Sequence, residues 1–165
     1  MNGWVAAFLV AQLLASGYAA AQGGAPERLV AAMLAVAAAA TTLLPRPSLV
    51  AYDAVFWGVV WVDLALLIAL VAVAATADRF WPMWLAALQL ITLATHGVRG
   101  YDSSLLPWAY WLLAGKIAYP MMLLLVVGTV RHRERKHAGL PEFAWTAQRH
   151  SHERRTDRAL APALA

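Results

Sequence analysis

Two charged residues lie inside stretches of the chain that are otherwise almost entirely apolar. Asp63 falls in residues 49–76, which form the longest apolar run, and Lys116 falls in residues 105–130. A helix over 49–76 would be about 42 Å long at ~1.5 Å per residue, longer than the ~30 Å hydrocarbon core of a bilayer. A charge held at that depth is costly, so each of these side chains needs a partner.

The simplest partner for each of these two charges is the other one. Helices over 49–76 and 105–130 are separated by one span and therefore run in the same direction, and both residues lie ~12 Å from the start of their apolar cores. We predict an intramembrane ion pair between Asp63 and Lys116. It can relay protons or bind an ion, or it can pin two helices together, and a single pair favours the structural role because it gives no pathway. If it does not form, Asp63 is expected to be neutral or held by Gln12 or Gln89.

A second group of polar residues is expected on the side of the membrane opposite to the C-terminal tail. His96 and Arg99 share one face of the helix expected over residues 82–98, and that face ends where Asp53 and Asp102 are expected. Histidine beside carboxylates can sense or move protons, and together they can ligate a metal. The alternative, which we favour, is a hydrogen-bonded cap on the end of a helix bundle, and we assign no metal to it. We call Asp53, His96, Arg99 and Asp102 the outer polar cluster.

Aromatic residues gather in the outer halves of the same two long helices. Rings at this depth can form a flat pocket for a quinone or another lipophilic ligand, but they are also the residues that anchor helices at the membrane interface, which we favour. The candidate members are Tyr52, Trp57, Trp61, Trp108 and Trp111.

The sequence contains none of the common catalytic motifs. There is no nucleophile elbow, phosphate-binding loop, HExxH or dinucleotide fingerprint, and the absence of cysteine excludes disulfides and thiolate chemistry. Haem ligation by two histidines within the membrane region is disfavoured because His96 is the only histidine before the tail. We therefore predict no catalytic residue and no cofactor.

The elements that must position these side chains are membrane-spanning helices. The 165 residues are 62% hydrophobic and 13% charged, and the apolar residues form long runs, so an all-α integral membrane bundle is expected. If residues 4–21, which end in an Ala19-x-Ala21 pattern, were a cleaved signal peptide, four spans would remain. The five expected spans are 4–21, 28–44, 49–76, 82–98 and 105–130.

The distribution of Lys and Arg predicts the orientation of the chain. Ten of the 13 Lys and Arg residues lie in the tail or in the loops around Arg28 and Arg79, which the alternation of spans places on the same side of the membrane as the tail. The positive-inside rule therefore places the C-terminus in the cytoplasm. Residues 131–165 are expected to form a basic, largely disordered cytoplasmic tail. Its charge indicates contact with anionic lipid and not with nucleic acid.

Part of the chain resembles a known family. The resemblance is to a family of short, uncharacterised multi-span inner-membrane proteins of GC-rich Gram-negative bacteria, and it implies a bacterial inner-membrane location and a multi-pass topology but no chemistry. The residues that carry it are VDLALL (62–67), ADRFWPMW (77–84), Tyr119-Pro120, GTVRHR (128–133), and Gly139, Pro141 and Trp145.

Three functions remain open at this point. The first is a non-catalytic accessory or assembly subunit that packs against a larger membrane-protein partner or against another copy of itself. The second is a small proton-coupled carrier that uses Asp63, Lys116 and His96. The third is a quinone-linked membrane enzyme. A wet, enclosed cavity that reaches Asp63 would favour the carrier, whereas a dry bundle with a large apolar face would favour the accessory subunit.

Overall fold

The protein is an all-α bundle with a separate helix at its C-terminal end. The computed structural model describes residues 3–44, 56–101, 116–139 and 142–160. The six helices of this part of the chain are α1 (Gly3–Gln22), α2 (Ala25–Leu43), α3 (Trp57–Thr76), α4 (Trp81–Tyr101), α6 (Ala118–His137) and α7 (Thr146–Leu160).

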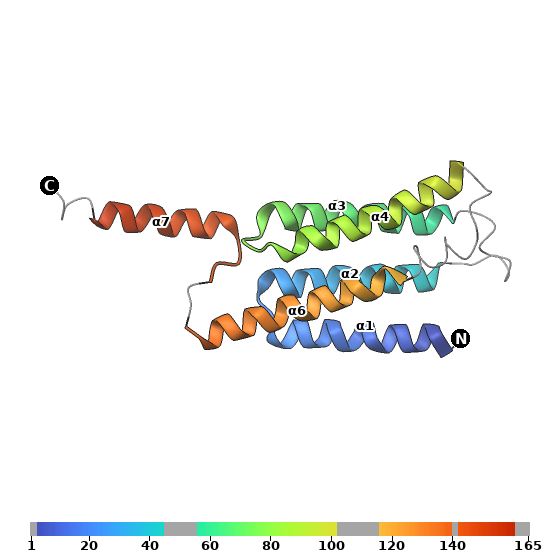
Figure 1. Ribbon diagram of the computed structural model, residues 1–165, viewed down its shortest axis with the longest axis horizontal. Helices are drawn as coiled ribbons and strands as arrows, with labels where there is room; N and C mark the ends of the chain where they lie inside the picture. The colour runs from blue at the N-terminus through green and yellow to red at the C-terminus, as the bar shows by residue number, and fades with distance from the viewer. Residues whose placement is uncertain (1–2, 45–55, 102–115, 140–141, 161–165) are drawn as a thin grey trace.

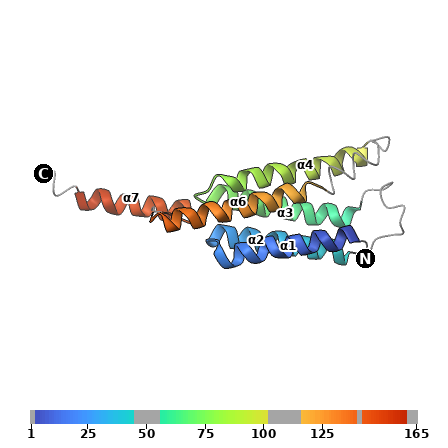
Figure 2. The same ribbon diagram turned by 60° about the horizontal axis from the view of Figure 1, so that its bottom comes forward.

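The first five of these helices form a ring. Going round it, α1 packs against α2, α2 against α3, α3 against α4, α4 against α6, and α6 back against α1, while α2 and α6 also meet across the centre. Their axes are roughly aligned in Figures 1 and 2, and α7 lies beyond one end of the bundle. We call this end, which holds the α1–α2 and α3–α4 turns, the tail-side end.

Of the six described helices, three are long and apolar enough to cross a membrane. They are Val5–Gln22 within α1, Ala25–Leu43 (α2) and Trp57–Thr76 (α3). α4 and α6 are not apolar enough over a sufficient length to meet the same criterion. The predicted membrane character is therefore supported, but hydropathy alone does not establish the number of five spans. At ~1.5 Å per residue, the 20 residues of α3 are about 30 Å long, which matches a bilayer core.

Exposed and buried residues are distributed as in a protein that faces lipid. Large apolar side chains such as Leu14, Val36, Ile68 and Leu123 are exposed on the outside of the bundle. The interior, by contrast, holds both apolar and polar side chains. Its buried polar residues are Gln12, Glu27, Gln89, Thr92, Thr95, His96, Arg99 and Thr129.

Several helix ends depart from the expected boundaries, and two of these differences have a clear local cause. α3 begins at Trp57 and not at residue 49, because Phe56 has an extended backbone with φ −84° and ψ 93° and acts as its N-cap. α6 continues past residue 130 to His137 and stops before Gly139, whose φ of 66° is the left-handed conformation that glycine adopts readily.

The segment after residue 130 has more regular structure than the disordered tail expected there. Residues 131–137 complete α6, and α7 is helical from Thr146 to Leu160. Salt bridges one turn apart support α7, since Nε of Arg149 lies 3.1 Å from a carboxylate oxygen of Glu153.

Candidate functional site

The Asp63 carboxylate is held by two side chains from α4. Nε2 of Gln89 donates to Oδ1 at 3.0 Å and to the backbone carbonyl of Asp63 at 3.1 Å, and Nε2 of His96 lies 3.0 Å from Oδ2. The His96 side chain is 5% exposed and that of Asp63 is 15% exposed. We call Asp63, Gln89 and His96 the Asp63 site.

The packing of α3 explains why these partners come from α4. α3 and α4 are joined by a short turn and pack more extensively than any other pair of described helices, so the polar face of α4 is turned toward α3. Gln89 and His96 are seven residues apart, which places them two turns apart on one helix face. Thr92 lies between them on that face and satisfies its hydroxyl by donating to the carbonyl of Leu88.

Among the described residues the ion-pair partner of Asp63 is His96, whereas the predicted partner was Lys116. α6 packs against α1, α4 and α2, so the helix that follows Lys116 is not an extensive neighbour of α3. The ammonium of Lys116 lies 5.3 Å from the ring centroid of Tyr119, in cation–π geometry. Among the described residues the Asp63 carboxylate contacts Gln89, the alternative given with the prediction, as well as His96.

The outer polar cluster is described only in part. His96 and Arg99 are both buried, as a polar face inside the bundle requires. Asp53 and Asp102 lie outside the described residues, so their predicted contact with His96 stays a prediction. The carboxylate found beside His96 is Asp63.

The described aromatic residues near the start of α3 face outward. The side chains of Trp57 and Trp61 are 66% and 65% exposed, which fits interfacial anchoring better than a shared pocket. The other members of the predicted aromatic pocket, Tyr52, Trp108 and Trp111, lie outside the described residues.

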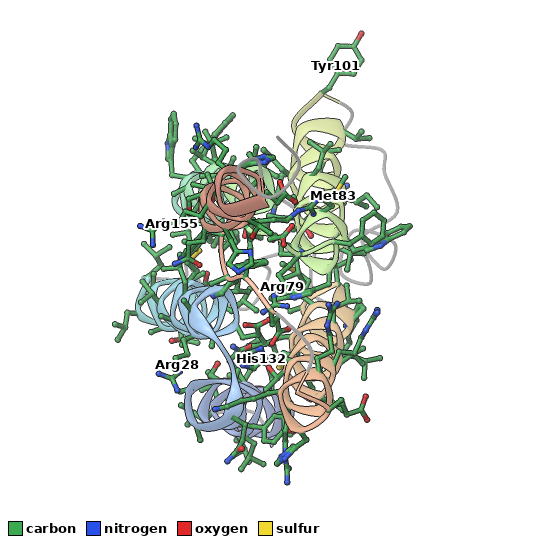
Figure 3. All side chains as sticks on the ribbon, turned by 90° about the vertical axis from the view of Figure 1, so that its left-hand side faces the viewer. Arg28, Arg79, Met83, Tyr101, His132 and Arg155 are labelled. Carbon is green, nitrogen blue, oxygen red and sulfur yellow. The ribbon has the colours of Figure 1, made fainter. Side chains whose placement is uncertain are left out.

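A second polar group, which the sequence did not predict, lies at the tail-side end of the bundle. It consists of Glu27, Arg79, His132 and Glu142, and we call it the tail-side cluster. Arg79 forms an ion pair with Glu142, and its Nε lies 3.6 Å from Oε1 of Glu27. Nδ1 of His132 lies 2.7 Å from Oε2 of Glu142 and 3.3 Å from NH2 of Arg79. Figure 3 shows Arg79 and His132 pointing toward each other between the helices, whereas Arg28 points outward.

Glu27 is the most deeply buried member of the tail-side cluster. Its side chain is fully buried, and neither carboxylate oxygen has a hydrogen-bond donor among the described residues. Two features offset the cost of that burial: the Arg79 guanidinium and the position of Glu27 in the first turn of α2, where the helix dipole favours a negative charge. Gly24 permits the arrangement, because a Cβ there would lie 3.0 Å from both Oε2 of Glu27 and Cε1 of His132.

The tail-side cluster also attaches the segment that carries α7. Glu142 brings this segment to Arg79, an isolated bridge joins Ala77 to Trp145, and the amide of Asp78 donates to the carbonyl of Ala144 at 3.2 Å. Arg149 then places NH1 3.2 Å from a carboxylate oxygen of Asp78. Its contacts with Glu153 and Asp78 raise the pKa of the Arg149 guanidinium. α7 is thus fixed to the α3–α4 turn and is not a free extension.

A layer of apolar side chains separates the Asp63 site from the tail-side cluster. Leu70, Leu85 and Leu125 are each completely buried and belong to the main hydrophobic core. Leu85 lies one turn from Gln89, and Leu70 lies two turns from Asp63, both toward the tail-side end. The three leucine side chains themselves offer a proton or ion no polar partner.

The chemistry available to these two groups is limited to charge pairing and proton exchange. The Asp63 site pairs a carboxylate with an imidazole, and the tail-side cluster pairs two carboxylates with a guanidinium and an imidazole. Within the described ranges, no group of three or more His, Asp or Glu side chains is arranged to hold a metal ion.

Comparison with protein-family models, with curated proteins and with solved structures finds no match for this chain.

One signal in the sequence pointed toward the tail-side cluster. Glu27 and Arg79 lie in the two loops that the alternation of spans places on the same side as the tail, so an ion pair between the loops was available. Nothing in the sequence distinguished His132 and Glu142 from the other charged residues of the basic segment. Glu142 is brought in by the reversal of the chain after His137, whereas His132 lies on α6, which packs against α2.

Proposed function

We propose that this protein is a small, non-catalytic integral membrane protein of the bacterial inner membrane that serves as an accessory or assembly subunit of a larger membrane complex. The observation that carries the proposal is the attachment of α7. A 15-residue polar helix projects beyond an apolar bundle and is fixed to it by the tail-side cluster. Its described side chains from Ala147 to Thr156 are all exposed, as a surface that contacts a partner must be.

The membrane arrangement belongs to the same proposal. All five bundle helices cross the bilayer, the N-terminus is outside, and α7 is in the cytoplasm. Support comes from the similar orientation of the five helices, from the excess of Lys and Arg at the tail-side end, and from the resemblance to the inner-membrane family. α4 has low hydropathy because its polar face is buried against α3, not because it is exposed to water.

The topology can be tested by cysteine labelling, because the chain has no native cysteine. A single cysteine at Ser151, which is exposed on α7, should react with a membrane-impermeant maleimide only after the cells are opened. A cysteine at Gly3, at the other end of the bundle, should react in intact spheroplasts. The reverse pattern would refute the orientation.

The functional part can be tested by purifying the full chain in a mild detergent and identifying what accompanies it. A stoichiometric membrane-protein partner is expected, and it should be lost when Asp78→Ala and Arg149→Ala together release α7. Loss from Arg135→Ala, an exposed substitution on α6, would contradict a role for α7. A chain that purifies alone under all conditions would refute the accessory role.

A proton-coupled carrier is the second candidate, and the Asp63–His96 contact is the observation that favours it. An intramembrane carboxylate beside an imidazole is an arrangement that many transporters use for protons. The apolar layer formed by Leu70, Leu85 and Leu125 weighs against it. Acidification inside proteoliposomes that is abolished by Asp63→Asn would favour the carrier over the accessory subunit.

A further inference from the structure

An apolar groove runs along the surface of the bundle between α1 and α6. Its volume is about 570 Å³, within the ~300–1,000 Å³ range of small-molecule sites. It is open to the outside of the bundle. Its lining includes Ala11, Ala15 and Tyr18 from α1, and Met122, Val126 and Val130 from α6.

The groove lies between an aromatic pair at one limit and charged residues at the other. Phe8 and Tyr119 meet edge to face one turn before its outer limit, with their ring centroids 5.7 Å apart. α1 and α6 run in the same direction, so the opposite limit is set by Tyr18 and Val130 near the tail-side end. Beyond Val130, the apolar part of α6 gives way to the basic residues 131–137.

Two basic residues continue the groove-facing strip of α6. Counted from Val126, the positions of Val130, Arg133 and His137 follow at spacings of four, seven and eleven, which keeps them on one helix face. Nε of Arg133 lies 3.5 Å from Nε2 of His137, and both side chains are exposed. Glu134 borders the same strip and is the acidic side chain beside it.

We propose that this groove binds an anionic glycerophospholipid, with an acyl chain along Ala11, Ala15 and Val126 and the phosphate at Arg133 and His137. The inference rests on the proposed function, because it needs α1 and α6 to span the membrane. An apolar channel that ends at a guanidinium has the polarity of this one class of molecule, and basic pockets between helices on the cytoplasmic side are known to take anionic headgroups. A second copy fits less well, since a symmetric contact at this face would bring the two Arg133 side chains together.

The test uses native mass spectrometry of the purified full chain, titrated with palmitoyl-oleoyl phosphatidylglycerol or with the corresponding phosphatidylcholine. Phosphatidylglycerol should bind more tightly, and Arg133→Ala should weaken it about fivefold, the factor that one basic side chain contributes near an anionic surface. Arg135→Ala is the matched control, because it removes the same charge from the opposite side of α6.

The apolar part of the site is tested separately with Ala15→Phe, which places a ring in the groove. Val10→Phe adds a similar ring at an exposed position of α1 outside the groove lining and serves as its control. Ala15→Phe should reduce binding of both lipids, whereas Val10→Phe should not. Circular dichroism of both variants confirms that the helices form, and Arg133→Ala gives an independent result if Ala15→Phe does not fold.

Four results would overturn the lipid site. The first two are that both lipids bind equally well, and that Arg133→Ala and Arg135→Ala weaken phosphatidylglycerol binding equally. The other two are that Ala15→Phe leaves lipid binding unchanged, and that the native chain forms a dimer that Ala15→Phe dissociates. The last result would mean that a second copy occupies the groove. Lipid binding is measured on the isolated chain, so failure to find a protein partner leaves this result intact. Cysteine labelling at Ser151 reports separately on the membrane topology.

Discussion

Replacing Arg79 should destabilise the bundle more than any other single charge removal at its tail-side end. Its guanidinium lies against two carboxylates, Glu27 and Glu142, whose side chains are 0% and 9% exposed. Arg79→Met would leave both charges buried with His132 as the basic side chain beside them. Breaking a buried pair by removing one partner costs roughly 3–5 kcal/mol, and the position near the end of the bundle argues for about 3 kcal/mol.

The measurement is the unfolding of the full chain in mixed micelles as SDS is added, followed by tryptophan fluorescence. Arg28→Met is the matched control, because Arg28 lies one residue from Glu27 but is exposed and points outward, and its loss should stay within about 0.5 kcal/mol. Arg79→Met combined with Glu142→Gln should cost less than the sum of the two single changes, because one stranded charge is then removed. If Arg79→Met and Arg28→Met both unfold at the same SDS concentration as the native chain, the tail-side cluster does not stabilise this end of the bundle.

Three further outcomes follow from other contacts. Asp63→Asn should lower stability by about 1 kcal/mol, the scale of hydrogen bonds between membrane helices, and His96→Gln should couple to it in a double-mutant cycle; additive effects would contradict the pairing. Gly128→Ala should lower the free energy of unfolding by about 1–3 kcal/mol in the same assay, because the new Cβ would lie 2.8 Å from the indole ring of Trp81. A variant as stable as the native chain would mean that this ring can move away. Hydrogen exchange should show that α7 loosens only in acid, because hydrogen bonds from Arg149 and His150 lower the pKa of Glu153. The stabilisation from these bonds is present above the ordinary carboxylate pKa and is lost as the pH falls through the lowered value. Loosening of α7 between pH 6 and 8 would refute this cause.

The sequence was most informative about where helices begin and end. Pro26, Pro82 and Gly139 mark two helix starts and one stop, and the apolar runs between such residues are long enough to be recognised without tertiary information. The start of α3 was less accessible. Apolar residues continue on both sides of Phe56, so composition did not reveal the extended backbone there.

The pairing of Asp63 shows what depth alone cannot provide. Counting residues along two helices gives the height of each charge in the membrane but not the direction in which it points around the helix axis. Asp63 and Lys116 have similar predicted heights, yet the neighbour across from Asp63 is α4 with Gln89 and His96. The polar stripe of α4 was visible in the sequence, and a short turn between α3 and α4 made it the nearer source of a partner.

The tail-side cluster depends on a chain reversal that no local pattern indicated. Charged residues next to membrane spans are usually solvated, which is the reasonable expectation for His132 and Glu142 when they are considered separately. The chain turns at Gly139 and Trp145 pairs with Ala77, which returns Glu142 to Arg79 and to His132 on α6.

The distance between the two polar groups bears directly on which function the bundle can perform. Along α4, Gln89 of the Asp63 site and Trp81 at the start of the helix are about 12 Å apart at ~1.5 Å per residue, and buried Leu85 lies between them. A carrier would have to open this layer during each cycle, because buried apolar side chains give a moving proton or ion no polar partner. An accessory subunit needs the opposite property. A sealed interior and a braced tail-side end keep α7 in one place relative to the membrane, so that whatever it contacts is positioned as well.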